Sequence, residues 1–95
     1  MFSIFRSQSA MLPLKQTWEH ADDELREAIL QASRQLDQQL HVNPQEKGEA
    51  REGNVRIAFQ EPLAVLFEVD QEKKLVRILR AWAYQVGVNK RRPLE

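Results

Sequence analysis

Three consecutive apolar runs between Asn54 and Trp82 restrict most strongly what this chain can fold into. The runs span Val55 to Phe59, Leu63 to Val69 and Leu75 to Trp82, and short polar breaks separate them. Runs of valine, isoleucine, leucine and phenylalanine with such breaks are typical of an antiparallel β-meander. The middle run stays apolar on both faces as far as Glu68, which predicts a central strand covered on both sides.

Side-chain alternation assigns faces to the outer two runs. The first run has an apolar face of Val55, Ile57 and Phe59 and a more polar face of Arg56, Ala58 and Gln60. In the third run, simple alternation places Val76, Ile78, Arg80 and Trp82 on one face and Leu75, Arg77, Leu79 and Ala81 on the other.

The segment before these strands predicts two helices and an edge strand. A helix from about Asp23 to Leu40 follows from apolar residues at helical spacing, namely Leu25, Ala28, Ile29, Ala32, Leu36 and Leu40. A shorter helix is expected from Leu12 to His20, because proline at position 13 suits a first turn but not a helix interior. Met1 to Phe5 predicts a strand that adds to the sheet, and 45–53 predicts a loop.

The expected order is strand, helix, helix and three antiparallel strands, which defines an α+β fold with a helix hairpin on one face of a mainly antiparallel sheet. A chain of 95 residues is large enough for one modest core. We therefore expect a single domain over residues 1–86, followed by a basic, frayed tail over 87–95 that contains Lys90, Arg91 and Arg92.

Composition excludes several classes of site. The chain has no cysteine, so it has no disulfide or thiolate site, and this favours a cytoplasmic location. His20 and His41 are interpreted as solvated helix-end residues, and no metal-ligand spacing is present. No apolar run reaches the roughly 18 to 20 residues of a membrane helix, and no glycine-rich phosphate loop occurs. We expect no membrane, metal or cofactor partner.

The order of elements, together with two stretches of sequence, resembles the RelE/ParE family of type II toxin-antitoxin toxins. The first stretch is a glycine-bracketed segment with Gly48, Glu49, Arg51, Gly53 and Arg56, and the second is LAVLFEV-DQEKK-LVRILRAW. The resemblance covers roughly Phe2 to Tyr84. It implies a cytoplasmic toxin that a cognate antitoxin protein neutralises, with ribosome-bound mRNA or DNA gyrase as the target.

The resemblance also implies where function resides. In RelE-like members, basic residues on the sheet bind and cleave mRNA, so Arg56, Arg80 and Tyr84 are the candidate catalytic residues. Candidate nucleic-acid or target-binding residues are Arg51, Arg77, Trp82, Lys90, Arg91 and Arg92. Ala58 and Ala64 occupy positions where many members carry a cation, and an arginine is a poor general base because it stays protonated. Ribosome-dependent endoribonuclease activity is therefore left open.

Three interpretations follow. The first is a toxin that poisons translation or, as ParE-like members do without a catalytic constellation, DNA gyrase. The second is a catalytically silent relative that keeps the fold and acts only as a protein-binding module. The third is an unrelated small α+β protein whose arginines form a solvated sheet face.

Overall fold

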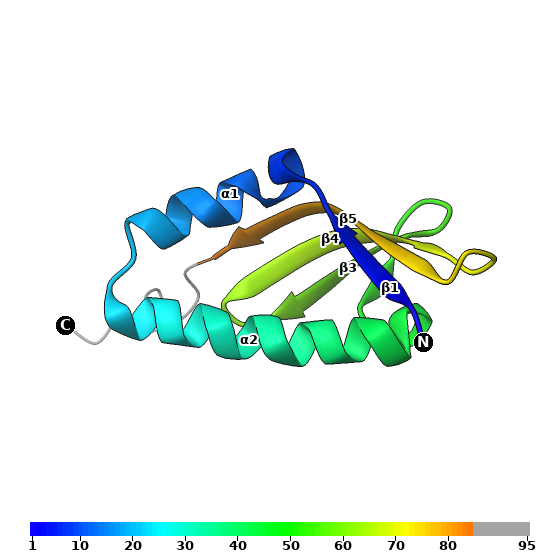
Figure 1. The fold of residues 1–95 in the computed structure, drawn as a ribbon, viewed down its shortest axis with the longest axis horizontal. Coiled ribbons are helices and arrows are strands. Elements are labelled where there is room, and N and C mark those ends of the chain that lie inside the picture. The colour runs from blue at the N-terminus through cyan, green and yellow to red at the C-terminus, as the bar shows by residue number, and fades with distance from the viewer. Residues whose placement is uncertain (85–95) are drawn as a thin grey trace.

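Two helices lie on one face of a five-stranded sheet in the computed structural model, which describes residues 1–84 (Figure 1). The elements are β1 (Ser3–Arg6), α1 (Gln8–Glu19), α2 (Asp23–Val42), the short 3-10 helix η1 (Pro44–Glu46), β2 (Glu49–Ala50), β3 (Val55–Gln60), β4 (Leu63–Asp70) and β5 (Leu75–Ala83). The predicted α+β class and helix hairpin are confirmed. The predicted division into 1–86 and 87–95 reaches beyond the described residues and stays a prediction.

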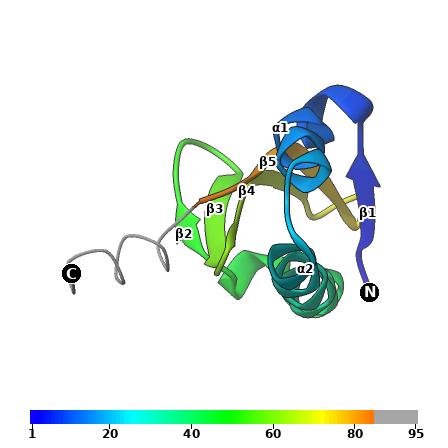
Figure 2. The ribbon, with the colours of Figure 1, turned by 90° about the vertical axis from the view of Figure 1, so that its left-hand side faces the viewer.

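The sheet has the strand order β1-β5-β4-β3-β2. The predicted meander is confirmed, since β3, β4 and β5 pair antiparallel. The predicted edge strand is also present, and β1 pairs parallel to β5 with Ile4 beside Val76. Figure 2 shows β1 and β2 at opposite edges, with both helices on the same side of the sheet.

The strand β2 corrects the prediction of an unstructured loop over 45–53. It has only two residues and pairs with Arg56 and Ile57 at the start of β3. Gly48 has φ +78°, and a Cβ atom there would lie 2.2 Å from the Ile57 carbonyl oxygen. The chain crosses the edge of β3 so closely that only glycine fits, and this long-range contact has no local periodicity that would predict it.

Helix α1 begins four residues before its predicted start. The Ser7 hydroxyl accepts the Ala10 N–H at 3.1 Å and so caps the N-terminus of α1. Pro13 therefore lies inside the helix, and the expectation that it marks the first turn is wrong. A proline at this position leaves the Ser9 carbonyl without its N–H donor, and because Ser9 is exposed, water can take that place.

Helix α2 follows the predicted stripe and extends two residues further, to Val42. The Asp22 carboxylate accepts the Leu25 N–H at 2.8 Å and caps the start of the helix. The buried residues of α2 are Ile29, Ala32, Leu36 and Leu40. No helix in the described part of the chain is long and apolar enough to cross a membrane.

The core lies between the helices and one face of the sheet. Phe67 on β4 and Val76 on β5 are fully buried there. The expectation that β4 is covered on both sides is wrong for the described residues, because α1 and α2 cover one face only (Figure 2). The other face of β4 carries Leu66 and Glu68, which are half-buried. We call this second face of the sheet the open face.

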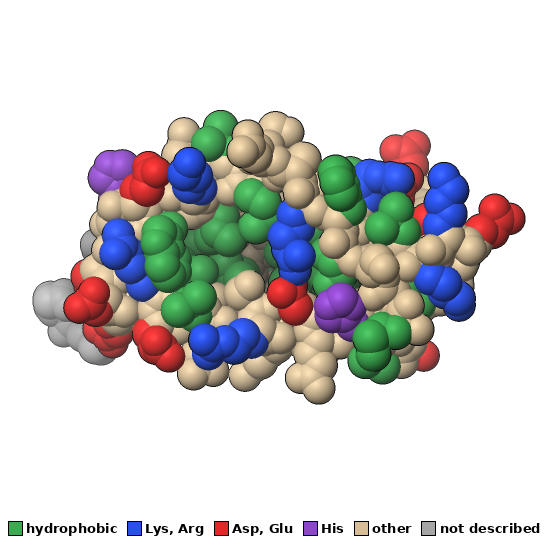
Figure 3. All heavy atoms as spheres, viewed as in Figure 1, with side chains coloured by type: hydrophobic (Ala, Val, Ile, Leu, Met, Phe, Trp, Pro, Cys, Tyr) green, Lys and Arg blue, Asp and Glu red, His purple; other side chains and the backbone are tan. Residues whose placement is uncertain are grey.

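The two helices stand apart over the sheet and leave a hollow between them. Figure 3 shows apolar side chains at the bottom of this hollow, and Met11, Leu36 and Ile78 are among its lining residues. The guanidinium of Arg6, at the end of β1, forms an ion pair with Asp37 of α2. Exposed ion pairs of this kind contribute at most about 1 kcal/mol to stability.

His41 has a structural contact that the sequence did not predict. Its Nδ1 atom lies 2.6 Å from the Phe2 carbonyl oxygen, and since a carbonyl only accepts, Nδ1 donates. The Phe2 N–H donates in turn to the His41 carbonyl at 2.8 Å. The interpretation of His41 as a solvated helix-end residue is therefore wrong, because it ties the N-terminal segment to α2. His20 is exposed at the end of α1, as expected.

Candidate functional site

A β-bulge in β5 sets the orientation of the residues at the end of that strand. Leu66 of β4 pairs with Arg80, whereas the next residue, Phe67, pairs with Ile78. Leu79 is therefore the extra residue, and the strand changes its side-chain alternation at this point.

The bulge brings two of the predicted residues, Arg80 and Trp82, to the face of the strand that Arg77 already occupies. Before it, Val76 faces the helices and Arg77 the open face; after it, Ala81 is buried while Arg80 and Trp82 turn to the open face. Simple alternation had placed Arg80 and Trp82 with Val76, and this prediction is wrong. One inserted residue is sufficient to move both side chains to the other face of the strand.

Aromatic side chains gather at one end of the open face. Phe59, Ala64 and Trp82 are neighbours in register across β3, β4 and β5. The rings of Phe59 and Tyr84 meet edge to face, with centroids 5.9 Å apart and an interplanar angle of 88°. Phe59 is 52% exposed, whereas Ala64 between the two aromatic residues is 0% exposed. We call Phe59, Trp82 and Tyr84 the aromatic cluster.

Arg77 and Arg80 differ in what holds them. The Arg77 guanidinium donates to the Glu68 carboxylate at 2.9 Å across the strand pair. Arg80 is exposed and forms no ion pair with any of residues 1–84. Arg80 is consequently the arginine whose charge is available to an anionic ligand on this face.

Tyr84 closes one end of the aromatic cluster. Its N–H donates to the Pro62 carbonyl at 2.9 Å, which fixes its backbone beside the turn between β3 and β4. Burial, and to a smaller degree the nearby Glu61 carboxylate, raises the pKa of the Tyr84 phenol above its ordinary value of 10.0. The phenol is therefore neutral at physiological pH, where it can donate a proton but does not act as a base.

Arg56 lies on the other side of the sheet from Arg80 and Tyr84. It pairs in register with Phe67, whose side chain is in the core under the helices. Its Nε and Nη2 atoms donate to the carbonyls of Lys47 and Gly48, each at 2.9 Å. The structure thus does not bring the three candidate catalytic residues together, and the contacts of Arg56 hold the loop before β2 against β3.

The remaining predicted positions are distributed more widely. Ala58, like Ala64, is 0% exposed, and it faces the helices rather than the open face. Arg51 lies in the exposed turn after β2, 3.5 Å from the Glu49 carboxylate. The predicted binding residues Lys90, Arg91 and Arg92 lie outside the described residues. Within the described part of the chain, no group of three or more His, Cys, Asp or Glu side chains is placed to hold a metal ion.

Phe59 is an open-face residue that the sequence pattern did not predict. It lies on the same face of the strand as Val55 and Ile57, and such an apolar face is the pattern of a core face. The structure places the more polar face of β3 toward the helices instead, because Ala58 is small enough to pack beneath them. The apolar alternation of β3 therefore did not identify Phe59 as a residue of the open face.

Comparison with known proteins shows what this architecture is similar to. No family model and no curated protein sequence matches the chain. Among solved structures, the isolated E. coli RelE toxin matches with a TM-score of 0.62 and 14% identity, over 100% of both chains. A chain of the RelBE2 toxin-antitoxin complex from Mycobacterium tuberculosis matches with a TM-score of 0.52 and 15% identity, over 86% of this chain and 96% of that one. These likenesses establish a RelE-like α+β fold, as the resemblance in sequence predicted.

Proposed function

We propose that this protein is a RelE/ParE-like toxin of a type II toxin-antitoxin module, which a cognate antitoxin neutralises in the cytoplasm. The observation that carries the proposal is the likeness to the E. coli RelE toxin over 100% of both chains. A match that covers the whole of both aligned chains supports a shared role more than a partial match does. A fold hosts many functions, so the proposal also rests on the open face.

The open face supports binding of a target. It combines an available cation, Arg80, with the exposed ring of Phe59 and the half-buried ring of Trp82. Flat aromatic surfaces beside a cation are suited to nucleic-acid bases and to protein partners alike. Of the described residues on this face, the candidate catalytic ones are Arg80 and Tyr84.

These two residues favour a poison that binds its target over one that cleaves RNA. Cleavage at a ribose 2′-hydroxyl requires a base, an acid and a cation at the phosphate. Arg80 offers the cation and Tyr84 a neutral proton donor, whereas the Glu68 carboxylate on the open face of β4 is engaged by Arg77. We therefore propose DNA gyrase, as for ParE-like members, ahead of ribosome-bound mRNA.

A catalytically silent, protein-binding relative is the second candidate. It is favoured by Ala58 and Ala64, which stand where the family resemblance leads us to expect cations and which are both fully buried. A protein of this kind retains its antitoxin partner but does not arrest growth.

Induced expression in a bacterial host separates the two candidates. The toxin proposal predicts growth arrest that co-expression of the small protein encoded by the neighbouring gene relieves. Normal growth at verified soluble expression, with the neighbour still co-purifying, supports the silent candidate and contradicts the toxin. Purified protein is then tested in a gyrase supercoiling assay and a ribosome-programmed mRNA cleavage assay. Inhibition of supercoiling is expected, and cleavage without such inhibition would refute the choice of gyrase.

A further inference from the structure

A row of four side chains crosses four strands on the open face. Glu49 of β2 pairs in register with Ile57 of β3, and Ile57 pairs with Leu66 of β4. Leu66 pairs in turn with Arg80 of β5. Residues that pair in register point to the same side of a sheet. The row therefore begins with an acidic side chain, ends with a basic one and has two apolar side chains between them.

The two charged side chains at the ends of this row are weakly engaged within residues 1–84. Arg80 is exposed and forms no ion pair there. Glu49 lies 3.5 Å from the Arg51 guanidinium, and because both of these side chains are exposed, their ion pair contributes little. Both ends of the row can consequently pair with a surface that presents the opposite charges at the same spacing.

A second copy of the open face presents the opposite charges at this spacing. Neighbouring strands lie about 4.8 Å apart, so Glu49 and Arg80 stand roughly 14 Å apart, at equal distances from the line midway between β3 and β4. A two-fold axis along this line, between two facing sheets, exchanges the two ends of the row. Arg80 of each copy then faces the partner's Glu49. Leu66 of each copy faces the partner's Ile57.

Apolar side chains lie where this symmetry requires them. Ile57 and Leu66 are half-buried and stand on either side of the axis. In the neighbouring row the same rotation brings the ring of Phe59, which is 52% exposed, against β4 of the other copy. Two sheets pack face to face about 10 Å apart, a distance that an arginine and a glutamate side chain span together. Exposed apolar faces of this kind mark sites of protein association.

We propose that two copies of this protein associate through their open faces as a two-fold dimer, in which Arg80 of each copy pairs with the partner's Glu49 around a centre of Ile57 and Leu66. The shared face is only four strands wide, so we expect a weak dimer with a dissociation constant in the micromolar range. The inference does not rest on the proposed toxin activity, because it concerns the protein alone. The dimer covers Arg80, so a target that binds the open face would compete with it.

The experiment measures self-association of the full chain by sedimentation equilibrium, at protein concentrations of about 1 to 200 µM. Arg80→Glu and Glu49→Arg each place like charges opposite one another at both ends of the row. Each variant alone should associate about tenfold more weakly than the wild type, or weaker still. An equimolar mixture of the two variants restores both pairs of opposite charges, so it should associate about as tightly as the wild type. Misfolding of either variant would not be reversed by mixing.

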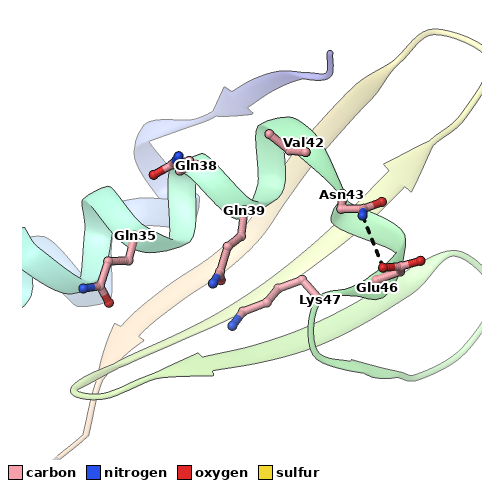
Figure 4. A pocket seen from close by; sticks show the side chains of 7 residues that line it. All are labelled: Gln35, Gln38, Gln39, Val42, Asn43, Glu46 and Lys47. Atoms are coloured by element: carbon pink, nitrogen blue, oxygen red, sulfur yellow. Dashed lines mark hydrogen bonds between the residues drawn. The ribbon is translucent and has the colours of Figure 1, made fainter.

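The matched control variants change side chains beside α2 instead. Glu46 and Lys47 belong to the lining of a polar hollow of about 680 Å³, and Figure 4 shows their side chains there. The lining of this hollow includes none of the four residues of the row. Glu46→Arg and Lys47→Glu change the net charge by the same amounts as Glu49→Arg and Arg80→Glu. Each control, alone or mixed with the other, should dimerise like the wild type.

Three results would overturn the proposal. The first is a wild-type chain that stays monomeric at every concentration. The second is a dimer that Arg80→Glu and Glu49→Arg leave unchanged, or that mixing the two variants does not restore, because the dimer would then use another surface. The third is a monomeric chain that binds single-stranded RNA and loses this binding in Arg80→Glu, which would assign the charge of the open face to nucleic acid.

Discussion

Replacing Gly48 by alanine tests how β2 and its loop are held against the sheet. Gly48 and Gly53 both have positive φ, at +78° and +61°, so alanine is strained at either site. At Gly53 an added Cβ meets nothing within 4 Å, and the cost is the left-handed conformation alone, about 1 to 2 kcal/mol. Gly53→Ala is therefore the matched control.

At Gly48 the added Cβ would lie 2.2 Å from the Ile57 carbonyl oxygen, so the loop has to move away from β3. This movement breaks the hydrogen bonds from Arg56 to the Lys47 and Gly48 carbonyls. Such bonds to a charged donor contribute roughly 1.5 to 3 kcal/mol each when buried, and less here because Arg56 is only half-buried. We expect Gly48→Ala to lower the free energy of unfolding by about 3 kcal/mol or more.

The assay is urea unfolding followed by tryptophan fluorescence, which reports on both tryptophans of the chain. Both substitutions remove the hydrogen bonds from Arg56 to the Lys47 and Gly48 carbonyls. Arg56→Ala should therefore destabilise the protein alone but add little to Gly48→Ala in the double variant. Equal unfolding free energies for Gly48→Ala and Gly53→Ala would refute the close crossing of β3. Full additivity of Gly48→Ala and Arg56→Ala would refute the structural role given to Arg56.

Two further predictions concern single side chains. Tyr84 is the only tyrosine, so absorbance at alkaline pH reports it directly, and its apparent pKa should exceed 10.0 and fall in Glu61→Gln. Because the folded-state pKa is raised, its contribution to stability is complete below pH 10.0 and is lost as pH rises through the folded value; a pKa at or below 10.0 would contradict the burial of the phenol. His41→Ala should destabilise the protein by about 1 kcal/mol and speed amide exchange at Phe2, because it removes the hydrogen bond to the Phe2 carbonyl. Unchanged exchange at Phe2 would show that His41 does not hold the N-terminal segment.

Local signals were sufficient to predict most elements of this fold. The apolar stripe of α2, the Asp22 cap and the three apolar runs each act within one segment, where helical or strand periodicity is a reliable guide. The start of α1 differs from the prediction because Pro13 lies in the helix interior, and the helix begins at Gln8 after the Ser7 cap. Proline in a helix interior is costly, but here it leaves only an exposed carbonyl without a donor.

The arrangement of the candidate site depended on contacts between distant segments. The bulge at Leu79 arises from pairing with β4, and it alone puts Arg80 and Trp82 on the open face. Arg56 was grouped with Arg80 by family resemblance, but its register with Phe67 places it on the helix-covered side, where its guanidinium donates to the Lys47 and Gly48 carbonyls. Neither the bulge at Leu79 nor the contacts of Arg56 can be predicted from the sequence of one strand. The residue types therefore identified the candidate residues, but only the structure showed that they lie on different faces.

Growth after induced expression shows whether the proposed RelE-like toxin acts through the open face. The wild type should arrest growth, and Arg80→Ala, which removes an exposed side chain without an ion pair among residues 1–84, should relieve the arrest at unchanged soluble level and melting temperature. Arg34→Ala on the exposed side of α2 is the control and should arrest growth like the wild type. Arrest by Arg80→Ala as strong as that by the wild type would contradict the role of the open face, and normal growth with the wild type would contradict the toxin itself.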